Sequence, residues 1–230
     1  MKSKTGSIIA IAPMHNTPGR HDATGAFIPE AKRFLKYHAQ PNSCLHLIDN
    51  HLSKARMYPA VRRVIDDPPS AFSGIAFFCH GYRTGIQFGI TTKNMTPLTD
   101  VIAGYSEEDV AVTCYCCDVA RDSDRHRQDD LETMGGDGGF CDELRDHLCV
   151  SGAVMCVVDG HTTAGHTTRN PDVRRFLGAG SDEGGVGGHY IVARAKRQLF
   201  KKWRQALRTN FRFQYPYLSD SDIMGYLGLL

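Results

Sequence analysis

The sequence lacks any apolar run that approaches the length of a membrane span. A transmembrane helix needs about 20 consecutive apolar residues, whereas the longest run near the start is Ile8–Ala12. The chain also lacks a repeat of domain size and a strong excess of one charge, with 27 Lys and Arg against 25 Asp and Glu. These absences argue against a membrane protein and a solenoid, and net charge alone does not indicate a nucleic-acid partner.

The cysteines do not follow a disulfide pattern. There are eight in 230 residues, and Cys114, Cys116 and Cys117 lie too close together for a framework of bridges. A chain of this length buries an adequate core without covalent links. Segment 1–14 is too weakly apolar for a signal peptide and predicts a first strand. We therefore expect a reducing, cytoplasmic compartment and no membrane contact.

Short apolar runs alternate with helical periodicity along most of the chain. Strands that are apolar on both faces and separated by helices indicate a parallel sheet covered on both sides. The fold expected is α/β: a three-layer α/β/α sandwich with a mostly parallel sheet of about six strands. The expected strands are Ser7–Ala12, Cys44–Ile48, Gly74–Phe78, Val110–Tyr115, Ala153–Val158 and His189–Ala193. Helices are expected around 27–38, 54–65, 98–105, 140–151, 195–209 and 219–230.

Two loops carry the residues that suggest chemistry. The third expected strand ends in His80-Gly81, and the fourth ends in Cys116-Cys117-Asp118. Ligands gather at the carboxyl ends of parallel strands, so neighbouring strands would bring His80 and Cys117 to one substrate. An imidazole can accept a thiol proton, and the N–H of Gly81 can approach a substrate carbonyl because glycine has no Cβ. Taken singly, such residues are more often surface histidines and buried core cysteines.

An apolar block ending in His80-Gly81, followed by one ending in Cys117-Asp118-Val119-Ala120, resembles the caspase-like cysteine peptidases of clan CD. The resemblance covers roughly residues 5–195 as an order of elements. It implies a caspase-like sheet, endopeptidase activity on a protein or peptide substrate, and a His80–Cys117 dyad with the Gly81 amide in the oxyanion hole. No cofactor or metal is implied. The family usually has a small residue before the nucleophile, so Cys116 leaves the assignment open between Cys116 and Cys117, of which we prefer Cys117.

Two further segments are interpreted through the same resemblance. Segment 121–139 is polar, ends in glycines and lacks apolar periodicity; relatives often cut themselves there, so self-processing is a hypothesis beside a plain solvated loop. Segment 161–171, with His161 and His166, follows the fifth expected strand, where relatives build substrate pockets. His161 and His166 are therefore candidate substrate-binding residues.

Other classes of protein remain open. His15 followed by Glu30 also resembles the start of zinc-dependent N-acetylmuramoyl-L-alanine amidases, with His80 as a third ligand. This alternative leaves the Cys117 loop unexplained. In domain organisation, we expect a caspase-like α/β domain, 1–195, with a C-terminal basic helical segment, 196–230, packed on the same domain. The basic residues of 194–212 offer a surface for an acidic partner, and a non-catalytic scaffold or binding protein with this fold is the third alternative.

Overall fold

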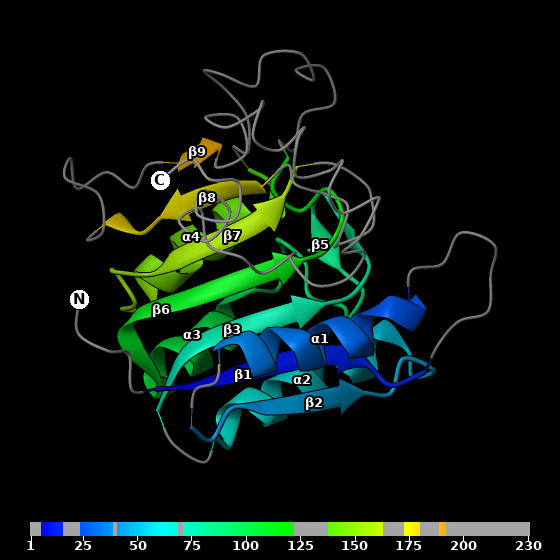
Figure 1. Cartoon of the computed structure of the whole chain (residues 1–230). Helices are drawn as coiled ribbons and strands as arrows, with labels where there is room; N and C mark the ends of the chain where they lie inside the picture. The colour runs from blue at the N-terminus through cyan, green and yellow to red at the C-terminus, as the bar shows by residue number, and fades with distance from the viewer. Residues whose placement is uncertain are drawn as a thin grey trace, which may run out of the picture.

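The structure of the chain is a computed structural model (Figure 1), and it describes residues 6–15, 24–38, 41–68, 71–121, 138–162, 173–179 and 189–191. Its centre is a seven-stranded sheet in the order β2-β1-β3-β6-β7-β8-β9. The strands are β1 Ser7–Pro13, β2 Cys44–Ile48, β3 Phe72–Phe78, β6 Ser106–Tyr115, β7 Val157–His161, β8 Val173–Leu177 and β9 His189–Ile191. A small hairpin, β4 Gly81–Tyr82 and β5 Gly85–Ile86, follows β3.

The first five strands of this order run parallel to one another, and the last two are joined to the sheet by antiparallel pairing. β1 pairs in parallel with β2 and β3, β3 with β6, and β6 with β7. β8 pairs antiparallel with β7, and β9 pairs antiparallel with β8, so β9 again runs in the direction of β7. The predicted α/β class with a mostly parallel sheet is therefore confirmed, with seven strands where about six were expected.

Helices lie on both faces of the sheet, which gives the three predicted layers (Figure 1). α1, Thr24–His38, packs on one face; α2 Lys54–Asp66, α3 Thr96–Tyr105 and α4 Phe140–Val150 pack on the other. The alternation of side chains along a strand explains the double cover. In β1, Ile8 and Ala10 join the core beneath α1, whereas Ile9 and Ile11 join the larger core on the opposite face.

The fifth predicted strand was placed too early in the sequence. Ala153–Val158 was expected to be extended, but Ala153 and Cys156 form a turn after α4, with the Ala153 amide donating to the Leu148 carbonyl at 2.9 Å. β7 begins at Val157 and continues to His161. Ala153 and Cys156 are buried, whereas Val154 is exposed. The apolar residues of the turn therefore resembled the start of a strand in the sequence.

Several expectations lie outside the described residues. These are the two helices expected at 195–209 and 219–230, the expected domain boundary between residues 195 and 196, and the basic segment 194–212. Within the part of the chain that is described, no helix has the length and apolar character needed to cross a bilayer.

Candidate active site

His80 and Cys117 follow neighbouring parallel strands at the same edge of the sheet. β3 and β6 pair directly, with Phe78 opposite Tyr115. His80 lies two residues beyond Phe78, and Cys117 lies two residues beyond Tyr115. Because neighbouring strands are about 4.8 Å apart, this register brings the segments that carry His80 and Cys117 to the same carboxyl edge.

The residue before His80 indicates which face of the sheet His80 occupies. The sulfurs of Cys79 and Cys116 lie 3.5 Å apart, and both side chains belong to the core beneath α2, α3 and α4. The next residue after Cys79, His80, lies on the opposite face. There the His80 ring meets the Phe27 ring of α1 edge to face, with centroids 5.2 Å apart.

The two candidate nucleophiles differ in burial. Cys116 is 1% exposed, and burial raises the pKa of its thiol. Cys117 is only half-buried. A raised pKa suppresses the thiolate, which is the reactive form, so Cys117 is the better placed of the two for nucleophilic chemistry. All eight cysteines lie in the described residues, and all are free thiols.

Gly81 packs directly against the turn that carries Cys117. A Cβ added to Gly81 would lie 2.6 Å from the Cys116 Cβ and 2.7 Å from the Cys117 carbonyl oxygen. Only glycine fits at this distance. The absence of a side chain therefore brings the backbone of the His80-Gly81 segment against the Cys117 turn.

The turn after Cys117 is held by its neighbours. Asp118 adopts a left-handed conformation, φ 58°, and its carboxylate accepts from Arg121 Nη1 at 3.1 Å. The Ala120 amide donates to the His161 carbonyl at 3.0 Å, and the Cys141 amide donates to the Val119 carbonyl at 3.0 Å. The turn is thus fixed to β7 and to α4.

His161 ends β7, next to β6, on the same face as Tyr115. Its side chain is 3% exposed and its ring centroid lies 6.0 Å from that of Tyr115. A side chain this buried has little access to a substrate, and the His161 backbone instead holds the Cys117 turn through its bond with Ala120. Its role in substrate binding stays a prediction, and His166 and residues 122–137 of the proposed processing loop lie outside the described residues.

Two polar residues near the site were not assigned to it from the sequence. The half-buried Tyr115 ring packs against the rings of Phe34 and Phe78, and desolvation, with the charges of Asp159 and Glu30, raises its pKa well above the usual value. Glu30 projects from α1 and is fully buried. Glu30 therefore lies under α1, near Tyr115 and on the face of the sheet that His80 occupies.

The zinc-ligand set of the amidase alternative is not brought together. Within the described residues, the cluster suited to a metal consists of His15, Asp49 and His51, and it contains neither Glu30 nor His80. Scans of the chain found no matching protein-family model and no matching curated protein. The resemblance to caspase-like peptidases therefore stays a prediction.

Proposed function

We propose that the chain is a cysteine peptidase of the caspase-like kind, acting on a protein or peptide substrate through His80 and Cys117. The observation that carries this proposal is the pairing of β3 with β6, Phe78 opposite Tyr115. It supports placing an imidazole and a half-buried thiol next to each other at the carboxyl edge. Sheets of this class gather ligands at that edge.

In the proposed reaction, the Cys117 sulfur attacks the carbonyl carbon of the scissile peptide bond. The C–N bond breaks, and His80 transfers the thiol proton to the leaving amine. Water then attacks the thioester, with His80 accepting its proton, and the acid and the free thiol are released. Free thiols throughout the chain agree with a reducing compartment such as the cytoplasm.

The close contact of Gly81 with the Cys117 turn suggests how the oxyanion is held. The backbone N–H groups of Gly81 and Cys117 are the proposed donors. Donors set in place before the reaction contribute a large share of the rate in acyl transfer, typically 10²–10³-fold for each donor. Self-processing within 121–139 is the corresponding proposal for activation.

Alkylation by iodoacetamide, read residue by residue by mass spectrometry, tests the thiol directly. We expect Cys117 to react faster than the other seven cysteines near neutral pH, and His80→Gln to slow Cys117 at least tenfold. Cys116→Ala is the matched control and should leave the rate at Cys117 unchanged. Equal labelling of Cys117 in wild type and His80→Gln would support a scaffold without a catalytic dyad.

Activity is tested with purified wild type, Cys117→Ala and Cys116→Ala on a mixed peptide library. Cleavage by wild type and Cys116→Ala, but not by Cys117→Ala, is expected. Intact mass of the same three proteins shows whether the chain is cut within 121–139. Cleavage that survives Cys117→Ala would overturn the assignment of the nucleophile.

A further inference from the structure

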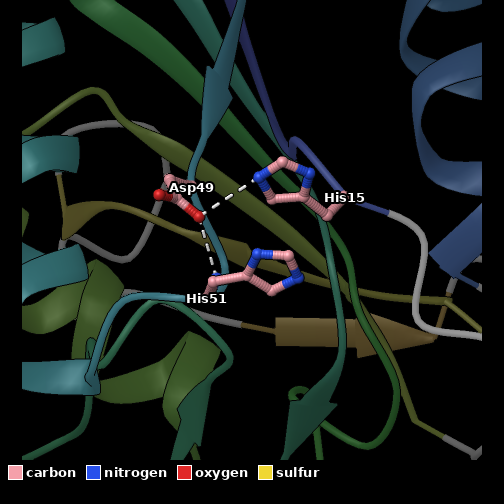
Figure 2. Close-up of side chains that lie close together, drawn as sticks. All are labelled: His15, Asp49 and His51. Carbon is pink, nitrogen blue, oxygen red and sulfur yellow. Dashed lines mark hydrogen bonds and ion pairs between the residues drawn. The ribbon is translucent and has the colours of Figure 1, made fainter.

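We propose a second site, separate from the thiol: His15, Asp49 and His51 bind one divalent transition-metal ion, with Zn²⁺ the best match. Figure 2 shows the three side chains together in the loops that follow β1 and β2. Their ligand atoms all lie within 4.8 Å of one another. The site needs no residue of the proposed peptidase.

The distances are close to those of a coordinated ion. His15 Nε2 lies 3.3 Å from Asp49 Oδ1. Zinc bonds of about 2.0–2.1 Å in a tetrahedron place two ligand atoms roughly 3.3 Å apart. Two of the three ligands are therefore already spaced for the metal, and only the His51 ring must turn.

The His51 ring is open to solvent, and turning it gives up its stack on the His15 ring. It is exposed and stacks on the His15 ring, with centroids 4.1 Å apart and planes within 3°. The backbone is already fixed, because the His51 amide donates to Asp49 Oδ1 at 2.9 Å. Metal binding thus requires a side-chain rotation without a change of the loop.

Reciprocal hydrogen bonds hold the two loops together. The His15 amide donates to Asn50 Oδ1 at 2.8 Å, and Asn50 Nδ2 donates to the His15 carbonyl at 3.0 Å. The Met14 amide donates to the Ile48 carbonyl at 2.8 Å. These bonds keep His15 beside Asp49 before any ion arrives, so little order must be gained on binding.

The donor set selects the class of ion. Two imidazoles and one carboxylate suit Zn²⁺, Co²⁺ and Ni²⁺, whereas Ca²⁺ and Mg²⁺ prefer oxygen ligands alone. The His15 and Asp49 side chains are 39% and 40% exposed, so water has access to the remaining coordination positions.

Titration calorimetry with Zn²⁺ on the untagged, EDTA-dialysed full chain at pH 7.5 tests the site. One ion per chain is expected, with His51→Gln and Asp49→Asn each weakening binding roughly tenfold or more. His147→Gln on α4 is the matched control and should bind like wild type. Thermal melts of the variants without metal check that they fold.

Cysteine thiolates are the main groups that could bind zinc in place of the proposed ligands. On β2, Cys44 Sγ lies 3.1 Å from His46 Nε2. Co²⁺ absorption separates the two, since nitrogen and oxygen ligands give no thiolate charge-transfer band in the near ultraviolet. A band of that kind, loss of binding in Cys44→Ser, or unchanged affinity in both His51→Gln and Asp49→Asn would overturn the proposal. An inactive Cys117 would not affect it, because Cys117 is not a ligand.

Discussion

Replacing Gly81 with alanine would separate the two loops of the proposed dyad. The new Cβ would lie 2.6 Å from the Cys116 Cβ, 2.7 Å from the Cys117 carbonyl oxygen and 2.8 Å from Val119 Cγ1. Carbon atoms in contact normally lie about 3.5–4.0 Å apart. The segments must therefore move apart by about 1 Å, and two of the three obstacles belong to the chain immediately around Cys117.

Gly81→Ala is expected to lower both the stability of the chain and the rate of cleavage, by different amounts. Overpacking of this kind costs about 1–3 kcal/mol in the free energy of unfolding. A displacement of about 1 Å between reacting groups costs about 10²-fold in rate. We therefore expect Gly81→Ala to remain folded in the absence of denaturant, with Cys117-dependent cleavage reduced about 100-fold.

Two glycines provide matched controls in urea unfolding and in the cleavage assay. Gly104 on α3 has open space around it, so Gly104→Ala should stabilise the chain by about 0.5–1 kcal/mol through helix propensity. Gly178 is tightly enclosed by the backbone of Val154 and Cys156. It follows β8, whose last residue pairs with Val157 at the start of β7, so it lies at the opposite edge of the sheet from Cys117.

Gly178→Ala should therefore lower stability without a specific effect on Cys117. If Gly81→Ala and Gly178→Ala lose similar stability and both retain the wild-type rate, the contact between Gly81 and the Cys117 turn does not position the dyad. The reasoning from close packing to catalysis would then be refuted.

Three further predictions concern the stability of the core. Arg145 donates to Asp142 at 2.6 Å in a largely buried ion pair, so Asp142→Asn should cost about 1–3 kcal/mol in urea unfolding; a loss below 0.5 kcal/mol would contradict this. Arg175 donates to both carboxylate oxygens of Asp159 at 2.8 and 2.7 Å, and because Arg175 is partly exposed, Arg175→Gln should cost only about 1 kcal/mol, read from the melting temperature. Burial raises the pKa of the Cys79, Cys116 and Cys141 thiols, so their stabilising effect is complete below the unfolded-state pKa of about 8.5 and is lost as the pH rises above it. The free energy of unfolding should fall between pH 8 and 10 by about 1.4 kcal/mol per pH unit for each thiol that stays protonated, and an equal slope in Cys141→Ala would argue against that contribution.

The sequence pattern was sufficient for the first three strands of the parallel sheet. β2, an edge strand with mostly half-buried residues, was predicted at its observed bounds. β1 and β3 were predicted within two residues of their bounds, because residues buried on both faces give continuous apolar runs. β8 was missed for the opposite reason. Val173–Leu177 contains two arginines, and one of them, Arg174, is almost fully buried, so hydropathy gave no sign of a strand.

The site was predictable only where it follows apolar strands. His80 and Cys117 come directly after strands that are easily recognised, so the rule of the carboxyl edge located them. Asp49 and His51 also follow such a strand, β2, but the sequence pattern indicated a link between His15 and Glu30 instead. The pairing of β1 with β2, Pro13 opposite Ile48, is long-range information, and the sequence carries no local sign of it.

Strand order explains why the carboxyl edge carries two separate groups of side chains, each of them a proposed site. β1 lies between β2 and β3, so the loop that carries His15 has both the Asp49–His51 loop and the His80 loop as neighbours. Two hydrogen bonds with Asn50 hold the His15 backbone next to the loop after β2. The missing side chain of Gly81 lets the His80 segment pack against the Cys117 turn. Each loop is thus held to a different partner. The proposed metal site on one side and the proposed peptidase site on the other rest on different contacts, and neither requires the other.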